Sequence, residues 1–364
     1  MTQRVEVAVV GGGPAGLSAA LAAARAGARV TLIDNQPAPG GQYFRQVPAT
    51  LVGAETARRR RGRAQWDEVV KAGVHIFSDT WVWGIDGDST LALYGPQAPA
   101  LLQAEAIILA TGAYDRPVAF PGWTLPGVMT AGAARVLGMQ QVLPGKRVLL
   151  AGSGPLQLVL AAELLRAGAE VVAVLEGARP LPGGLRQLHR MWGQWARLAE
   201  GLHSMLTLVR GRVDYRTGWG IVAASGTADR LQQVTIARLD AQWRVIPGSE
   251  QVVACDTLCL GYGFVPFTTL ARLLGTQLEW RPELGGEVPV RDALMHTSVP
   301  GVYAVGDGAG IGGAELAMVE GEIAGIAAAA RLQQRMDIAE PHLRRLAARL
   351  GRARRFQRLM CALF

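Results

Sequence analysis

The sequence predicts an α/β fold made of two Rossmann-like units, the second inserted into the first. Two glycine-rich turns support this prediction, VVGGGPAG at 9–16 and LLAGSGP at 149–155, and each directly follows an apolar run that is typical of a buried strand. A third signature, VYAVGDG, lies at 302–308. A single glycine fingerprint would be weak evidence, but three such features in this order indicate a chain with two dinucleotide-binding domains.

The first turn has the spacing that a dinucleotide-binding strand–turn–helix needs. Gly11 allows a sharp turn off the strand, Gly13 lets the backbone approach a pyrophosphate, and Gly16 allows the helix to pack closely on the sheet. The helix, continued by the Ala- and Leu-rich residues 17–26, then directs its free N–H groups at the phosphates. Asp34 follows the next strand, where a carboxylate can bind ribose hydroxyls.

The remaining elements follow from punctuation by Gly and Pro and from hydrophobic spacing. We expect a helix at 64–72, a β-meander over 74–94, a strand at 104–109, a Pro- and Gly-rich connection at 117–126, a helix at 156–167, strands at 170–175, 205–215 and 231–238, and a helix at 314–332. The predicted domains are 1–116 with 252–335, an inserted domain at 117–251, and a basic amphipathic helix at 336–364.

Composition narrows the class of protein. The 364 residues, 50% hydrophobic and 18% charged, are enough for two cores. We find no signal peptide or transmembrane run and expect a cytoplasmic protein. The net charge of +8 is concentrated in arginines at 58–63 and 344–358, which are not interleaved with aromatic residues. We therefore expect solvated helix faces and no nucleic-acid binding.

The cysteines and histidines give no sign of redox or metal chemistry. Cys255 and Cys259 fall on a predicted strand, where residues four apart share a face about 13 Å apart. Because two cysteines can form a disulfide only when their Cα atoms lie within about 7 Å, we interpret both as core residues. Cys361 is single, so the chain cannot build a four-cysteine iron–sulfur site by itself. No histidine has a telling carboxylate or metal-like spacing, so the catalytic residues stay unknown and no metal site is predicted.

Five segments together resemble a known family. They are GGGPAG (11–16), GGQYFRQ (40–46), ATGAYDRPVAFPGWTLPGVMTAGAA (110–134), AGSGP (151–155) and VYAVGDGAGIGGAELA (302–317). The chain resembles the two-dinucleotide-domain flavoproteins related to thioredoxin reductase. It is most similar to the A or α subunits of opine oxidases, D-hydroxyproline and proline dehydrogenases, and hydrogen cyanide synthase. The resemblance covers nearly the whole chain.

The resemblance implies that FAD binds in the first unit. The implied contacts are Gly11, Gly13, Pro14, Ala15, Gly16, Asp34, Asn35, Gly41, Gln42, Ala110, Thr111, Gly112, Gly306, Asp307 and Ala314. Asp307 would bind the ribityl chain, and the helix that begins near Ala314 would direct its N-terminus at the pyrimidine edge of the flavin. Tyr43 and Arg45 follow the Gly-Gly-Gln turn and are further candidates to approach the flavin.

The second fingerprint departs from the dinucleotide pattern at one position. Gly152, Gly154 and Pro155 are present, and Glu176 ends the following strand as a ribose-binding acid would. Gln157, however, replaces the third glycine, and we expect its side chain to crowd the helix–sheet packing. This leaves three hypotheses for the second site: NAD(P), another adenine nucleotide, or an inherited unit with no ligand.

Three functions remain open from the sequence. The first is the FAD-containing α subunit of a heteromeric amine or imino-acid dehydrogenase, of the opine, D-hydroxyproline or proline type. Its partners would be a second flavoprotein (β) subunit and a ferredoxin-like 2Fe–2S protein. The alternatives are a stand-alone NAD(P)H-dependent reductase of a ferredoxin-like acceptor and a non-catalytic nucleotide-binding scaffold. We expect the helix at 336–364 to dock on a partner, the alternative being that it folds back on its own FAD domain.

Overall fold

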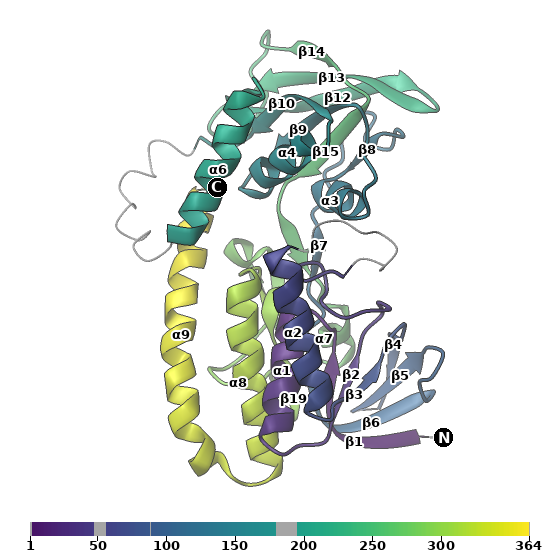
Figure 1. Cartoon of the computed structure of the whole chain (residues 1–364), viewed down its shortest axis with the longest axis vertical. Helices are drawn as coiled ribbons and strands as arrows, with labels where there is room; N and C mark the ends of the chain where they lie inside the picture. Colours follow the sequence, from purple (N-terminus) through teal and green to yellow (C-terminus); the bar gives the residue numbers. More distant parts are fainter. Residues whose placement is uncertain (1, 47–55, 88, 180–194, 364) are drawn as a thin grey trace. The chain divides into compact units, whose positions relative to one another are not determined.

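The computed structural model describes residues 2–46, 56–87, 89–179 and 195–363, and the chain forms two compact units (Figure 1). Unit 1 comprises Met1–Tyr114 and Val265–Gln357, and unit 2 comprises Asp115–Phe264 and Arg358–Phe364. The predicted α/β fold with two Rossmann-like units is confirmed. We expected the chain to return to the first unit at residue 252. It returns at 265 instead, because the strand before that point pairs within the sheet of unit 2.

The core of unit 1 is a seven-stranded sheet. Its strands are β1 (Thr2–Val10), β2 (Val30–Ile33), β3 (His75–Phe77), β4 (Trp81–Asp86), β5 (Thr90–Tyr94), β6 (Leu101–Leu109) and β19 (Val302–Ala304). The order is β3-β2-β1-β6-β5-β4, and β19 pairs with β6. The strands β3, β2, β1, β6 and β19 are parallel neighbours, whereas β4, β5 and β6 form an antiparallel meander. The meander expected over 74–94 is therefore only partly right, because β3 pairs in parallel with β2 at the opposite edge of the sheet.

Two glycine- and alanine-rich helices pack tightly on this sheet. They are α1 (Pro14–Arg25) and α8 (Ala314–Leu332), which lie side by side in Figure 1. Gly321 and Gly325, one turn apart on α8, face the backbone of α1, where a Cβ would collide with the carbonyl oxygens of Ala15 and Ala19. Small residues at this spacing let the two helix backbones approach closely, which brings the beginning of α8 beside the beginning of α1.

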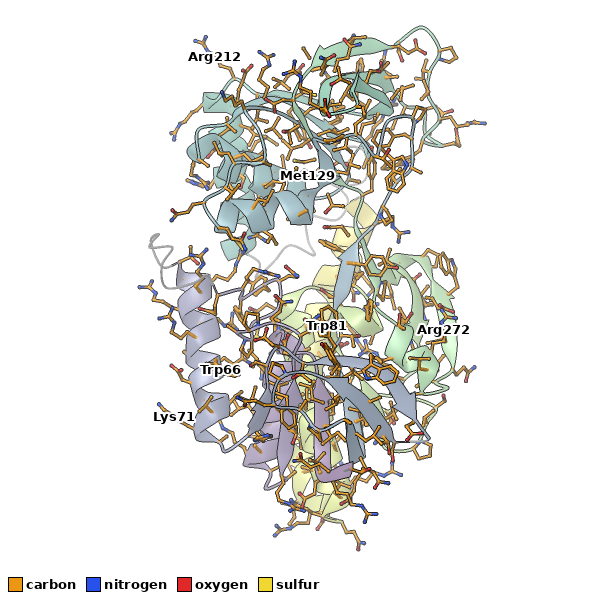
Figure 2. All side chains as sticks on the ribbon, turned by 90° about the vertical axis from the view of Figure 1, so that its right-hand side faces the viewer. Trp66, Lys71, Trp81, Met129, Arg212 and Arg272 are labelled. Carbon is orange, nitrogen blue, oxygen red and sulfur yellow. The ribbon has the colours of Figure 1, made fainter. Side chains whose placement is uncertain are left out.

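The arginine-rich segment at 58–63 belongs to α2 (Ala57–Lys71), which begins earlier than the helix expected at 64–72. Thr56 caps this helix by accepting the N–H of Arg59. Figure 2 shows Trp66 and Lys71 on α2, and Trp66 packs against the core of unit 1. Most of the arginine side chains are solvated, as expected, and Arg61 forms an ion pair with Glu315 at 2.7 Å.

The basic helix near the C-terminus is α9 (Met336–Leu363). Leu343, Leu346 and Leu350 are buried in the same core as residues of α1 and α8. The expectation that this apolar face docks on another subunit is therefore wrong, and up to residue 357 the helix folds back on its own unit. The apolar side chains at 356 and 359–364 are not among those that the structure describes.

Unit 2 is built on a five-stranded parallel sheet. Its strands are β8 (Val128–Thr130), β9 (Arg147–Gly152), β10 (Glu170–Glu176), β11 (Asp214–Thr217) and β15 (Thr257–Gly261), in the order β11-β10-β9-β15-β8. The helices of this unit are α3 (Ala131–Met139), α4 (Leu156–Arg166) and α6 (Trp195–Arg210). A three-stranded antiparallel sheet is formed by β12 (Trp219–Thr227), β13 (Arg230–Arg238) and β14 (Gln251–Ala254). One core contains side chains of α3 and α4, and a second contains side chains of β12 and β13.

The strand expected at 205–215 is wrong. Most of this segment is the end of α6, and only residues from Asp214 onward form β11. Met205, Thr207 and Val209 alternate with leucines in the sequence, which imitates a strand. Ser204 and Leu208 are the buried positions, and their spacing of four residues is that of a helix packed on α4.

Smaller elements complete the two units. They are β7 (Ala113–Asp115) and β16 (Phe264–Pro266), which pair where the chain passes between the units, α7 (Thr269–Leu273), β17 (Leu278–Arg281), the 3₁₀ turn η2 (Pro282–Leu284), β18 (Gly286–Pro289) and the 3₁₀ turn η3 (Gly306–Ala309). Among the described residues, no helix combines the length and the apolar character that crossing a membrane requires.

Candidate functional site

Four parallel strands of unit 1 end at one edge of the sheet, and the residues after them build the site. The strands are β2, β1, β6 and β19, adjacent in that order. They lead into Asp34, Gly11, Ala110 and Gly306 respectively. Ligands of open α/β sheets bind beyond the carboxyl ends of such strands. The pairing of these strands thus gathers residues that lie far apart in the sequence.

The first glycine loop is too crowded for side chains at two of its positions. Gly11 has a φ of +106°, and a Cβ there would collide with the carbonyl oxygen of Ala110. A Cβ on Gly16 would collide with the carbonyl oxygen of Gly11. Gly13 is the N-cap of α1, with Pro14 as the first helical residue and no side chain capping the helix. The N–H groups at this helix end remain free to bind an anionic group.

Asp34 reaches back from β2 to the glycine loop. Its Oδ2 accepts the N–H of Gly12 at 2.5 Å, and its Oδ1 accepts the N–H of Gln36 at 2.8 Å. Burial raises the pKa of this carboxyl, and the two backbone hydrogen bonds and the Arg45 guanidinium oppose that shift. Each carboxylate oxygen retains a second lone pair, so Asp34 can also accept a ribose hydroxyl.

The Gly-Gly-Gln turn lies against the same loop. Gly41 faces Gly13 so closely that a Cβ on Gly41 would lie 2.9 Å from the Cα of Gly13. The Oε1 of Gln42 accepts a hydrogen bond from the Nη2 of Arg45 at 3.2 Å. Asn35 is exposed, and within the described residues its side chain accepts a hydrogen bond from Gln36.

Arg45 provides a direct test of whether the residues present fit an anionic ligand. In the described part of the chain, its Nε is buried without a hydrogen-bond partner. A buried guanidinium N–H with no acceptor is unfavourable, and a phosphate oxygen would satisfy it. Arg45 was only a minor candidate in the sequence, because nothing there indicated that its Nε would be buried.

Two turns meet on the other side of the loop. Gly308, in the Gly-Asp turn, approaches Thr111 and Gly112 so closely that a Cβ on it would lie 2.7 Å from the Thr111 hydroxyl. Gly306 contacts Ala15, the second residue of α1. The glycine loop at 11–16, the turn at 110–112 and the Gly-Asp turn at 306–308 are therefore brought together at one place.

Asp307 organises the beginning of α8. Its Oδ1 accepts the N–H groups of Gly312 at 2.9 Å and Gly313 at 3.0 Å, immediately before the helix begins at Ala314. Burial raises the pKa of Asp307, and these two hydrogen bonds oppose the shift. Oδ2 is the carboxylate oxygen that takes no part in this turn, and it can accept a hydroxyl of a ligand.

A buried ion pair behind this turn was not predicted from the sequence. Glu320, on α8, is fully buried and accepts both terminal nitrogens of Arg291 at 2.8 Å and the N–H of Gly306 at 3.0 Å. Arg291 also donates to the carbonyl oxygen of Ala304 at 2.9 Å. One carboxylate therefore fixes β19, the Gly-Asp turn and α8 relative to one another. The sequence signal was weak, because Glu320 is one of three glutamates in this Ala- and Gly-rich helix.

The second fingerprint forms a similar arrangement within unit 2. Glu176 is buried at the end of β10, and its carboxylate accepts the N–H groups of Gly154 and Ala178, each at 3.0 Å. Both this acid and Asp34 lie 22 residues after the glycine whose N–H they accept. Burial raises the pKa of Glu176 against these hydrogen bonds. Pro155 is the N-cap of α4 and provides no side-chain cap.

Gln157 does not crowd the second unit as we expected. It is buried on α4 and lies against Gly261 of β15, where a Cβ would be 3.1 Å from its Cγ. The glycine in the neighbouring strand thus makes the room that the missing third glycine would have provided. Both polar atoms of the Gln157 amide are buried without a partner among the described residues.

Two of the three cysteines lie in the core of unit 2. Cys255 and Cys259 are buried and free, and burial raises the pKa of each thiol to about 12. Their assignment as core residues is confirmed, but the expectation of a shared face is wrong. Cys255 precedes β15 and packs with residues of β13, while Cys259 packs with residues of α4. Cys361 has no described side chain.

The described histidines have no metal-binding arrangement around them. His296 bonds through its two ring nitrogens to Asp292 at 3.0 Å and to the buried Tyr303 hydroxyl at 2.9 Å, which is a structural role. Among the described residues, no group of three or more His, Cys, Asp or Glu side chains could hold a metal ion.

The fold and the two glycine loops with their strand-end acids define a protein of the two-dinucleotide-domain class. Residues 5–331 match the model of the pyridine nucleotide-disulphide oxidoreductases, so the chain belongs to this family. It is a flavin-dependent oxidoreductase, and FAD is its cofactor. The crowded glycine loop, the free N-terminus of α1 and the unpartnered Arg45 Nε fit such a group.

Several known proteins are similar to the chain. It is 32% identical to the A subunit of opine oxidase from Rhizobium meliloti, over 89% of this chain and 62% of the relative. It is 33% identical to the HcnB subunit of hydrogen cyanide synthase from Pseudomonas aeruginosa, over 93% of this chain and 75% of that protein. The fold is similar to that of T. acidophilum thioredoxin reductase, with a TM-score of 0.67, 18% identity, and coverage of 91% and 99% of the two chains. The chain thus spans somewhat less than two thirds of the length of the opine oxidase relative.

Proposed function

We propose that this chain is the FAD-bearing α subunit of a heteromeric amine or imino-acid dehydrogenase, of the opine, D-hydroxyproline or proline type. In this proposal a second flavoprotein (β) subunit oxidises the substrate, and this chain passes the electrons to an acceptor such as a ferredoxin-like 2Fe–2S protein. The opine oxidase relative and HcnB are by name subunits of larger enzymes, which supports a subunit role here.

The observation that carries the proposal is the contrast between the glycine loop of unit 1, with Asp34 and Arg45 beside it, and the buried thiols of unit 2. The described cysteines lie in the core of unit 2, and their pKa values near 12 keep them protonated at neutral pH. A thiolate is the form that attacks a disulfide, so these two thiols are unsuited to disulfide chemistry. Electrons on the flavin therefore pass to a carrier other than these two thiols, and a partner protein is the simplest one.

Within unit 1 the residues proposed to bind FAD contact different parts of the cofactor. The N–H groups at the start of α1 bind the pyrophosphate, with the Arg45 Nε as an additional donor, and Asp34 accepts the adenosine ribose hydroxyls. Asp307 accepts a ribityl hydroxyl through its Oδ2. The N-terminus of α8 faces the pyrimidine edge, where its positive end favours negative charge. Bound FAD supplies the ability to take up and release electrons one or two at a time.

In unit 2 we assign a second nucleotide site to Gly152, Gly154, Pro155 and Glu176. The similarity in position between Glu176 and Asp34 supports this assignment, as does the uncapped N-terminus of α4. The same observations favour a second candidate function, a stand-alone NAD(P)H-dependent reductase of a ferredoxin-like acceptor, because a reductase needs a pyridine nucleotide in this unit.

Isolation of the tagged chain from its own cells tests the proposed function. We expect a second flavin-containing polypeptide to co-purify, and the complex to reduce a dye with an amine or imino acid as donor. The chain stripped of its partner at high salt should retain FAD and lose this activity. If the chain purifies alone and still oxidises such a donor at the full rate, the subunit proposal is wrong.

A further inference from the structure

A short hairpin in unit 2 holds a tryptophan at an unusual position. Residues 239–245 form a tight turn after β13, closed by the bridge between Leu239 and Val245. Asp240 accepts the N–H groups of Gln242 at 2.8 Å and Arg244 at 2.9 Å through one carboxylate oxygen. Trp243, at the tip, has a φ of +63°, a backbone conformation that side-chain-bearing residues rarely adopt. The turn thus holds Trp243 in a conformation that must be favoured by other contacts.

The indole ring of Trp243 lies on the residue that follows the strand-end acid. A Cβ on Gly177 would collide with the six-membered part of the ring, so the ring rests directly on the Gly177 backbone. The N–H of Gly177 donates to the carbonyl oxygen of Gly152 at 2.8 Å, which ties this residue to the second glycine loop. Moving away from the second glycine loop, the order is therefore Glu176, then Gly177, then the indole of Trp243.

Hydrogen bonds keep the hairpin beside the acid. The N–H of Gly218 donates to the carbonyl oxygen of Glu176 at 2.7 Å, and the N–H of Leu239 donates to the carbonyl oxygen of Gly218 at 2.8 Å. Arg179 closes the connection, because its Nη2 donates to the carbonyl oxygen of Leu239 at 2.6 Å. The position of Trp243 relative to Glu176 is consequently fixed by backbone contacts and does not depend on a flexible loop.

The ring is nevertheless still open to a ligand. Trp243 is 45% exposed, although one side of the ring is covered by Gly177. A tryptophan used only to fill the core would have both faces covered. In a Rossmann unit the acid at the end of the second strand binds the ribose, and the base lies outward from it, over the following residues. Trp243, which contacts Gly177 directly after Glu176, lies in this region.

We propose that Trp243 is the stacking platform for the adenine base of a nucleotide bound in unit 2, with Glu176 on its ribose. This inference rests on the second nucleotide site of the proposed function and names the residue that recognises the base. Purine bases stack on aromatic side chains, and the stacking is favourable enough to change affinity by about tenfold to 100-fold. Gly177 is required beneath the ring, because any side chain there would displace it.

The test is binding of AMP to the full-length chain with saturating FAD, so that the site of unit 1 is occupied, measured by calorimetry. We expect Trp243→Ala to weaken AMP binding by about tenfold or more, and Trp243→Phe to weaken it only a few-fold, since the aromatic face remains. Trp83→Ala is the matched control, because Trp83 is 70% exposed on β4 of unit 1 and should have no effect. Glu176→Gln tests the ribose contact independently.

The outcomes separate this inference from the proposed function. If the wild-type chain binds AMP, and Glu176→Gln weakens binding while Trp243→Ala does not, the site exists and the stacking role is wrong. If the wild-type chain binds no AMP at millimolar concentration, both the second site and the stacking role are wrong. Should Trp243→Ala unfold, Trp243→Leu keeps an apolar side chain without an aromatic face and must weaken binding in the same way.

Discussion

Replacement of Glu320 by alanine tests the ion pair that joins α8 to the Gly-Asp turn. The substitution removes the acceptor of three hydrogen bonds, two from Arg291 and one from the N–H of Gly306. Arg291 is only 13% exposed, so its charge would be left in the protein interior. A second cation, Arg354, lies 3.7 Å from Glu320, but its side chain is 43% exposed and can be solvated when the carboxylate is removed.

The magnitude follows from this geometry. Three charge-assisted hydrogen bonds at about 1.5–3 kcal/mol each would sum to roughly 5–9 kcal/mol if they were independent. They share one carboxylate, however, and Arg291 keeps its bond to the Ala304 carbonyl oxygen, so the effects should not add fully. We therefore expect the lower value that is typical of broken buried pairs, about 3–5 kcal/mol. Replacement of Arg291 by methionine in the same chain should recover part of this loss.

Urea denaturation of the full chain, monitored by circular dichroism, measures the change in the free energy of unfolding. Glu340→Ala is the matched control, because Glu340 forms an exposed pair with Arg344 that should contribute at most about 0.5 kcal/mol. We also expect Glu320→Ala to lose FAD, since the Gly306 turn would no longer be fixed. A loss of stability below about 1 kcal/mol, equal to that of the control, would refute the reasoning.

Three further predictions concern the cofactor, the thiols and pH. Asp34→Ala should weaken FAD binding about tenfold to 100-fold through loss of charge-assisted hydrogen bonds, measured by fluorescence titration, and an unchanged affinity would remove Asp34 from the site. Replacement of Cys255 and Cys259 by serine should leave the rate of flavin reduction by dithionite unchanged in folded protein, whereas a large decrease would mean that the thiols carry electrons. Burial raises the pKa of Tyr303 from 10.0, and that of Cys259 from 9.0, to about 12. The stability from these protonated groups is present below their unfolded pKa values and decreases as pH rises toward 12, so the free energy of unfolding should fall between about pH 9 and 12, and less steeply in Tyr303→Phe.

The sequence predicted best those features that depend on short-range pattern. The spacing of Gly11, Gly13 and Gly16 predicted α1 and its neighbouring strands, and Gly11 and Gly16 have a local steric reason. The carboxyl-end position of Asp34 and Asp307 followed from parallel strands. The segment at 205–215 failed because alternating and helical patterns overlap in a short run of Leu, Met and Val.

Features that depend on long-range partners were out of reach. Nothing near Gln157 in the sequence indicates that Gly261, about a hundred residues later, makes room for it. The pairing of Glu320 with Arg291 needs α8 and β19 to be placed first. Whether α9 packs on its own unit or on another subunit depends on which surface its leucines cover. An amphipathic pattern predicts the apolar face of a helix, but it does not predict the surface against which that face packs.

Anaerobic mixing of the FAD-loaded chain with NADH tests the proposed subunit role most directly. We expect the isolated chain, lacking its partner, to keep its flavin oxidised in excess NADH for many minutes, with the absorbance near about 450 nm unchanged, and to lose that absorbance at once with dithionite. AMP added beforehand should make no difference. Rapid bleaching by NADH alone, prevented by AMP, would contradict the subunit role, because it would make the chain a stand-alone NADH-dependent reductase.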